Sequence, residues 1–114
     1  MLAIESDSGV FKPTGYGFLG SGEGMKVIQQ IGGLLAPIGA GEIKKGCRGA
    51  DVMRLISGGV PVMHLEVDRE RYFWFHHTHA DTIDKLDRNE FNQCVASMAV
   101  MAYVAADLPQ PIPR

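Results

Sequence analysis

The sequence lacks the features that mark several classes of protein. Its charges nearly balance, with 11 Lys and Arg against 13 Asp and Glu, so it has no basic surface of the kind that binds nucleic acid. Its two cysteines form neither a disulfide framework nor a metal-ligand spacing. The longest apolar run, residues 95–106, is interrupted by Ser97 and is too short to span a bilayer. We therefore expect no nucleic-acid partner, no membrane segment and, within this chain, no signal peptide.

The composition is that of a protein with a packed core. Of the 114 residues, 46% are hydrophobic and 21% are charged, which is typical of a globular domain. We expect residues 1–114 to form one unit without an internal boundary. The chain begins inside an apolar stretch at Leu2 to Ile4, so this unit reads as the tail of a longer sheet.

Hydrophobic periodicity predicts three strands that alternate with three helices. The expected strands are residues 2–4, 42–45 and 60–67, and the expected helices are residues 25–35, 52–56 and 88–106. This order predicts an α/β fold, in which helices cover the faces of a layered sheet. The glycine-rich segment 13–24 is expected to be an irregular connection. Its G-x-G-x-x-G string at residues 15–20 lacks the preceding strand that a dinucleotide site requires.

Two helix starts carry capping signals. Asp51 stands before the short helix 52–56 and is predicted to be its N-cap. Asp87 and Glu90 have the spacing of a capping box at the start of the last helix. That helix is apolar nearly all round, so we expect it to be buried on more than one side.

The first group of residues that could carry chemistry is His76, His77, His79 and Asp81. Neutral imidazole is the commonest metal ligand in proteins, but a polar loop with solvated histidines is an equal alternative. If this segment is extended, His77 and His79 share one face and His76 takes the other. His64 lies within a strand pattern and is interpreted as a core histidine.

The second group is Glu5 to Gly9, directly after the first strand. In open α/β sheets, ligands bind beyond the carboxyl ends of the strands, so Asp7 is a candidate metal ligand. The alternative is an Asx turn in which Asp7 accepts hydrogen bonds from nearby backbone amides.

Several strings, in this order, resemble the co-catalytic two-zinc exopeptidases of the carboxypeptidase Q type. No single string is decisive, and their order and distances carry the resemblance, which covers nearly the whole chain. The strings are residues 5–15 (ESDSGVFKPTG), 49–51 (GAD), 58–61 (GGVP), 73–82 (FWFHHTHADT) and 86–87 (LD).

The resemblance implies a fold, a cofactor and site residues. It implies the C-terminal portion of a three-layer α/β/α zinc-peptidase sheet, and a hydrolase that acts on dipeptides or short peptides through water activated by two zinc ions. Asp7 matches the terminal carboxylate of one zinc, and His77 matches the terminal histidine of the other. Asp81 is expected to support the metal-bound imidazole, with a turn cap before Thr82 as an equal alternative. His76 and His79 are expected to contact substrate or to be solvated. The resemblance also implies a secreted or periplasmic parent protein.

The sequence departs from the family in what it lacks. The family's first histidine, its bridging aspartate and its adjacent pair of glutamates, one of which is the general base, have no counterpart here. We therefore expect no catalytic base in this chain and no activity of the chain alone. Because the last helix is apolar nearly all round and the sheet would have an unpaired edge, we also expect self-association or a homodimer. Two alternatives remain open: a non-catalytic binding or dimerisation module, and a separate metal site made by His77 and His79.

Overall fold

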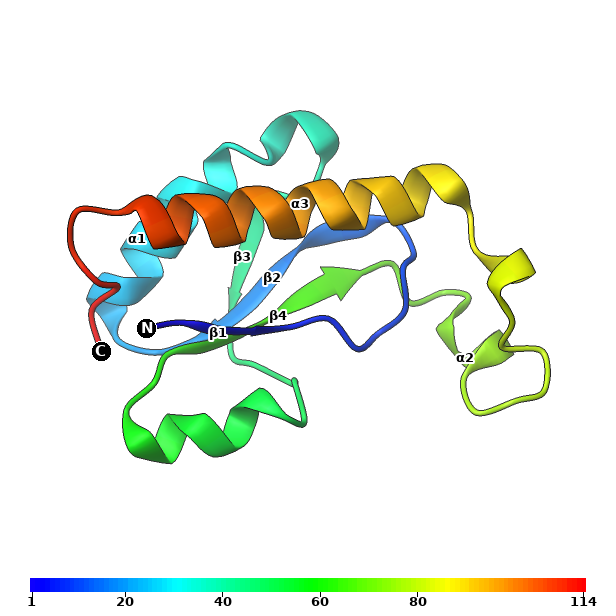
Figure 1. The fold of residues 1–114 in the computed structure, drawn as a ribbon, viewed down its shortest axis with the longest axis horizontal. Coiled ribbons are helices and arrows are strands. Elements are labelled where there is room, and N and C mark those ends of the chain that lie inside the picture. Colours follow the sequence, from blue (N-terminus) through cyan, green and yellow to red (C-terminus); the bar gives the residue numbers. More distant parts are fainter.

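The computed structural model describes residues 1–114 and contains a mixed sheet of four strands in the order β1-β4-β2-β3 (Figure 1). The strands are β1 (Ala3–Glu5), β2 (Pro13–Leu19), β3 (Glu42–Lys45) and β4 (Val62–Val67). β4 is parallel to β1 and antiparallel to β2, while β2 and β3 are parallel. β1 and β4 therefore both end at the same edge of the sheet.

Helices cover both faces of this sheet. They are α1 (Gly22–Gly33), α2 (Tyr72–Phe75) and α3 (Arg88–Asp107), with short 3₁₀ helices η1 (Ala36–Ile38), η2 (Val52–Gly58) and η3 (Ile83–Lys85). α1 and α3 contact each other and β2, whereas η2 contacts β1 and β4 (Figure 1). The predicted α/β class is confirmed. None of the helices combines the length and hydropathy required to cross a bilayer.

β2 is an inner strand of the sheet, so the prediction of an irregular connection over this segment is wrong. Tyr16 and Phe18 are fully buried on one side of it. On the opposite side, a Cβ atom at Gly17 would lie 2.2 Å from Cε1 of His64, and one at Gly15 would lie 1.9 Å from the carbonyl oxygen of Glu42. These glycines permit close approach of neighbouring chain segments and do not mark a turn.

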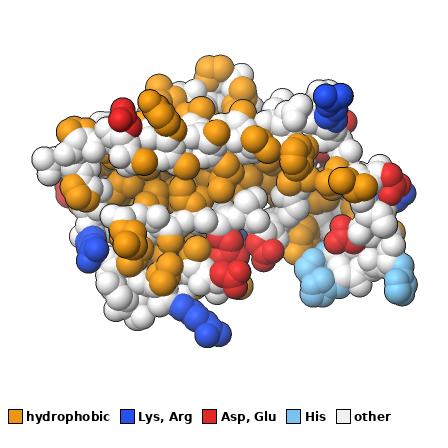
Figure 2. All heavy atoms as spheres, in the orientation of Figure 1, with side chains coloured by type: hydrophobic (Ala, Val, Ile, Leu, Met, Phe, Trp, Pro, Cys, Tyr) orange, Lys and Arg blue, Asp and Glu red, His pale blue; other side chains and the backbone are white.

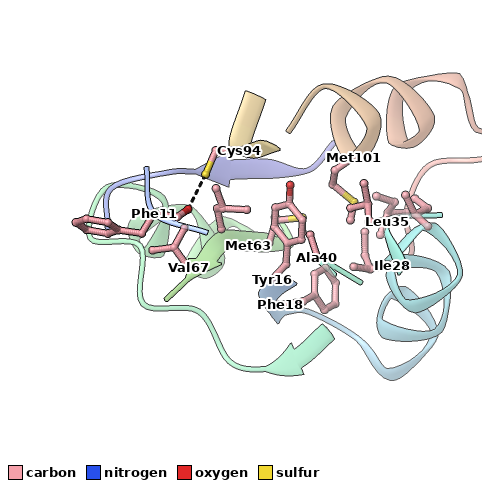
Figure 3. Packing of buried hydrophobic residues seen from close by; sticks show 13 residues of the cluster. Phe11, Tyr16, Phe18, Ile28, Leu35, Ala40, Met63, Val67, Cys94 and Met101 are labelled. Carbon is pink, nitrogen blue, oxygen red and sulfur yellow. Dashed lines mark hydrogen bonds between the residues drawn. The ribbon is translucent and has the colours of Figure 1, made fainter. Parts of the chain in front are cut away.

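The core lies between the sheet and the two long helices (Figure 3). The hydroxyl groups of Tyr16 and Ser97 form a buried hydrogen bond of 2.9 Å, and the thiol of Cys94 donates to the carbonyl oxygen of Phe11 at 3.1 Å. The first bond connects α3 to β2, and the second connects α3 to the segment before β2. They satisfy polar groups that would be costly to bury alone.

α3 buries one stripe only. Cys94, Ser97 and Met101 are its buried residues, whereas Val95 is 52% exposed and Tyr103 is 71% exposed. The expectation of burial on more than one side is therefore wrong within this chain, because only one sheet face meets the helix.

The two predicted caps have different outcomes. Asp87 accepts hydrogen bonds from the backbone amides of Asn89 and Glu90, at 2.8 and 2.9 Å, and begins α3 as predicted. Asp51 was wrongly predicted to cap η2, since its backbone is helical and its side chain makes no capping bond. The Glu5 carboxylate, distant in sequence, accepts the amides of Asp51 and Val52 instead, both at 3.1 Å.

Replacing Tyr16 with Phe should destabilise the protein by about 1–3 kcal/mol, because the buried hydroxyl of Ser97 loses its partner. Urea unfolding followed by circular dichroism measures this loss. The double variant with Ser97→Ala should be less destabilised than the sum of the two single variants. Equal and additive losses would show that the bond contributes nothing.

Tyr16→Phe should also make the free energy of unfolding less sensitive to alkaline pH. Burial raises the pKa of Tyr16 from 10.0 to about 12, and the Ser97 hydrogen bond opposes the rise. The unfolded chain therefore releases this proton first, so the stabilisation is complete below pH 10 and decreases as the pH rises towards 12. Tyr16→Phe should keep the parts due to Cys94, whose pKa burial raises from 9.0 to about 11, and to Cys47, whose pKa burial also raises.

Candidate metal-binding site

A hollow of about 400 Å³ lies beyond the shared edge at which β1 and β4 end. The segment after β1 forms one wall and the segment from α2 to η3 forms the other. The lining residues are Ser6, Asp7, Gly9, Val10, Phe11, Tyr72, Phe75, His76, His77, Asp81, Lys85 and Leu86. Figure 2 shows histidine side chains at this end of the molecule.

The hollow contains four of the five residues singled out from the sequence. Asp7, His76, His77 and Asp81 all line it, although Asp7 and His77 lie 70 positions apart. His79 is exposed and does not line the hollow. The parallel pairing of β1 with β4 accounts for the meeting, because it brings the carboxyl ends of two distant strands together.

The histidine segment is not extended, contrary to the assumption made from the sequence. Tyr72 to Phe75 form one helical turn, and the amide of His76 donates to the carbonyl oxygen of Tyr72 at 3.0 Å. The rings of His76 and His77 are stacked with centroids 3.8 Å apart. The two histidines therefore lie side by side and do not point to opposite faces.

His77 has a strained backbone. Its φ of 56° makes it the only residue other than glycine with a positive φ in the chain. Such a conformation costs on the order of 1–3 kcal/mol and tends to occur at functional sites. The hydroxyl of Thr78, which donates to the carbonyl oxygen of Phe75 at 2.7 Å, holds the turn from the other side.

Asp81 is not the residue that organises the turn after it. The hydroxyl of Thr82 donates to Oδ1 of Asp84 at 2.5 Å, and Nζ of Lys85 lies 2.5 Å from Oδ2. These bonds to Lys85 and Thr82 lower the pKa of Asp84 to about 2. Asp81 lines the hollow together with His76 and His77.

The ligand types in the hollow suit zinc, but the chain does not complete a site. Carboxylate oxygen and imidazole nitrogen are ordinary zinc donors, and Asp7 and His77 offer one of each to the same space. Nowhere in the chain do three or more His, Cys, Asp or Glu residues form a group that could hold a metal ion. The alternative of a separate site made by His77 and His79 stays a prediction: His77 lines the hollow and His79 does not.

Sequence reasoning missed the aromatic part of this wall and the lysine beside it. Tyr72, Phe75 and Lys85 line the hollow, and the ring of Tyr72 stacks on that of His76 with centroids 4.5 Å apart. The aromatic run before the histidines was the available signal. No helix was expected there, because the histidine segment that follows was assumed to be extended.

A second polar cluster lies on the face of the sheet opposite to the hydrophobic core. His64 is 6% exposed, and its Nδ1 accepts the backbone amide of Arg48 at 3.2 Å. Its Nε2 lies 3.1 Å from Oε1 of Glu66 but without hydrogen-bond geometry. Glu66 also pairs with the Arg48 guanidinium. His64 is buried as predicted, but it lies outside the hydrophobic core and its Nε2 has no hydrogen-bond partner, so the interpretation as a satisfied core histidine is only partly correct.

Known proteins similar to this chain are peptidases. Carboxypeptidase Q of *Rattus norvegicus* and of *Bos taurus* are 38% and 39% identical to it over 113 residues. That match covers 99% of this chain and 24% of each relative. The solved structure of a peptidase M28 precursor from *Shewanella amazonensis* superimposes with a TM-score of 0.89 at 29% identity. It matches 99% of this chain and 26% of the other. No protein-family model matches the sequence.

The chain therefore spans about a quarter of the length of the relatives that it matches. The sequence strings, the fold and the relatives all indicate the same group of enzymes. The predicted resemblance is confirmed: this chain is a relative of carboxypeptidase Q and matches part of that protein.

Proposed function

We propose that this chain forms part of a two-zinc exopeptidase site, to which Asp7 and His77 each contribute one zinc ligand. The observation that carries this proposal is that Asp7 and His77 line one hollow at the edge where β1 and β4 end. Carboxylate and imidazole are suitable zinc ligands, and the relatives are peptidases. Zinc ions held there would supply activation of water and polarisation of the scissile carbonyl.

The neighbouring residues have supporting roles in this proposal. Metal-bound imidazoles usually donate their second N–H to a carboxylate or carbonyl, and Asp81 lines the same hollow as His77. His76 stacks on His77 with a centroid distance of 3.8 Å and restricts the orientation of that ring. His79 is exposed and does not line the hollow, so its role in this proposal is a contact with substrate at the periphery of the site.

The remaining ligands and the general base must come from polypeptide other than these 114 residues. A catalytic zinc takes three protein ligands as a rule, and a positioned carboxylate must accept the proton of the attacking water. The parent protein would act on dipeptides or short peptides, in a secreted or periplasmic setting. The alternative function is a binding or dimerisation module that uses the same fold without catalysis, favoured by the exposed apolar residues of α3.

The purified 114-residue chain should not hydrolyse peptides, with or without added zinc, because it contains one ligand for each ion and no base. Incubation with a set of dipeptides, followed by detection of free amino acids, tests this. An Asp7→Ala variant prepared in parallel distinguishes the chain's own turnover from that of a contaminating peptidase. Turnover that persists through repurification and disappears in Asp7→Ala would contradict the proposal.

His77 and His79 should differ in their effect on zinc. The test protein is rat carboxypeptidase Q in which this chain replaces the matching 113-residue part. Asn is the suitable replacement, because it tolerates the positive φ of His77 better than most residues. His77→Asn should lose one of two zinc ions and nearly all activity, whereas His79→Asn should retain both ions.

Zinc content from atomic absorption and kcat with a dipeptide are the two measurements. Loss of zinc in His79→Asn with retention in His77→Asn would reverse the assignment. Retention of zinc in both variants would remove His77 from the site.

The isolated chain should also self-associate at micromolar concentration. Phe91, Val95 and Tyr103 are exposed on α3, where Figure 2 shows hydrophobic side chains at the surface, and no charged residue lies between Glu90 and Asp107. Burial of apolar surface contributes about 25 cal/mol per Å². Sedimentation velocity should show dimers that Val95→Glu dissociates and the control Gln29→Glu, at an exposed position of α1, does not. A monomer at all concentrations would contradict this expectation.

A further inference from the structure

The polar cluster around His64 borders a hollow of its own. This hollow has a volume of about 310 Å³ and shares no lining residue with the hollow that contains Asp7 and His77. Its lining residues are Gly17, Lys44, Lys45, Gly46, Cys47, Arg48, His64 and Glu66. Nearly all of them are polar or charged, so a ligand that binds here must be polar too.

The register of the sheet places three of these residues in one row. Gly17 stands opposite His64 on β4 and opposite Lys44 on β3, so the three residues share one face of the sheet. A Cβ atom at Gly17 would lie 2.2 Å from Cε1 of His64 and 2.8 Å from its Nδ1. The imidazole of His64 therefore lies over β2, and it borders the hollow together with Lys44.

His64 has an unused hydrogen-bond donor. Its Nδ1 accepts the backbone amide of Arg48 at 3.2 Å, so the proton of the neutral ring is on Nε2. That nitrogen is buried without a hydrogen-bond partner, in a side chain that is only 7% exposed. A buried donor without a partner is costly, and a ligand with an acceptor oxygen would satisfy it.

The hollow combines this donor with three cations and one carboxylate. The guanidinium of Arg48 donates to both carboxylate oxygens of Glu66, which leaves Lys44 and Lys45 as the excess positive charge. Nζ of Lys44 lies 3.2 Å from Glu42, but both side chains are more than half exposed, so this ion pair is weak. The charge of the hollow thus favours an anion.

We propose that this hollow binds inorganic phosphate. Nε2 of His64 and the ammonium group of Lys44 donate hydrogen bonds to phosphate oxygens. Glu66 accepts the O–H that inorganic phosphate retains at neutral pH, because a carboxylate has about four acceptor sites and Arg48 occupies one on each oxygen. Sulfate carries no proton at neutral pH, so the carboxylate of Glu66 repels it.

A phosphate ester suits the hollow less well than inorganic phosphate. The second pKa of such an ester is about 6, so at neutral pH most of it has lost the proton that Glu66 would accept. A surface that merely carries lysines would bind all three anions alike. Preference for inorganic phosphate over sulfate and over an ester is therefore the property that distinguishes this site from a general anion-binding surface.

The test titrates the 114-residue chain at pH 7 and constant ionic strength with phosphate, sulfate and glycerol phosphate. Amide chemical shifts measured by NMR report the site, and calorimetry reports the dissociation constants. Phosphate should bind saturably, with one ion per chain, and should shift the amides of Gly46 and Arg48. Sulfate and glycerol phosphate should bind at least tenfold more weakly. Sulfate binding as tight as that of phosphate, tighter binding of the ester, or shifts that do not saturate would overturn the proposal.

A matched pair of lysine variants tests the location of the site. Lys44 and Lys26 are both exposed and each is paired with a glutamate, but only Lys44 lines the hollow. Lys44→Gln should weaken phosphate binding roughly fivefold, whereas Lys26→Gln should leave the dissociation constant unchanged. An equal loss in the two variants would attribute the binding to net charge and contradict the proposal.

Glu66→Gln tests the selectivity. The amide side chain no longer repels sulfate, and it can donate a hydrogen bond to a sulfate oxygen. The dissociation constants for sulfate and phosphate should therefore become nearly equal in this variant. A preference for phosphate that stays at tenfold or more would remove Glu66 from the site and overturn its role in the selectivity. If Glu66→Gln does not fold, the anion series and the lysine pair decide the proposal by themselves.

Discussion

The arrangement of this protein depends on the burial of Tyr16 between the sheet and α3. The residue lies on β2, which pairs with β4 on one side and β3 on the other. Its ring fills the core, and its hydroxyl meets that of Ser97, so one side chain connects three strands to the longest helix. A buried hydroxyl without a partner is costly, which makes this position of α3 more favourable than a slide along the sheet.

From this docking the candidate site follows by geometry. With β2 antiparallel to β4, β4 runs towards the edge at which β2 begins. β1 pairs parallel with β4 and ends there too. The segments that follow these two strands carry Asp7 and His77, and they form opposite walls of one hollow. The strained φ of His77 and its stacking on His76 restrict the orientation of the His77 imidazole beside the hollow.

Local sequence signals predicted the local features well. The apolar stripe of α1, the run of β4 and the Asp87 cap each depend on residues within a few positions of one another, and all three are present. β2 could not be recognised because its glycines are required by the close approach of Glu42 and His64, which are distant in sequence. Likewise the cap of η2 comes from Glu5, some 46 positions away. Asp7 and His77 are predicted as zinc ligands through the resemblance, since spacing alone leaves three histidines equivalent.

The polar cluster around Glu5 shows how the strings that carry the resemblance are related in space. Glu5 belongs to the string that contains Asp7, and its Oε2 accepts the amides of Asp51 and Val52. A Cβ atom at Gly49 would lie 2.4 Å from this same oxygen, so only glycine fits there. His64, opposite Glu5 in the sheet register, holds the same loop through the amide of Arg48. The strings at residues 5–15 and 49–51 are thus in direct contact, and this contact holds the end of β1 against the loop that precedes η2. Since Asp7 follows Glu5 by two residues, this contact restricts the position of the proposed zinc ligand without touching it.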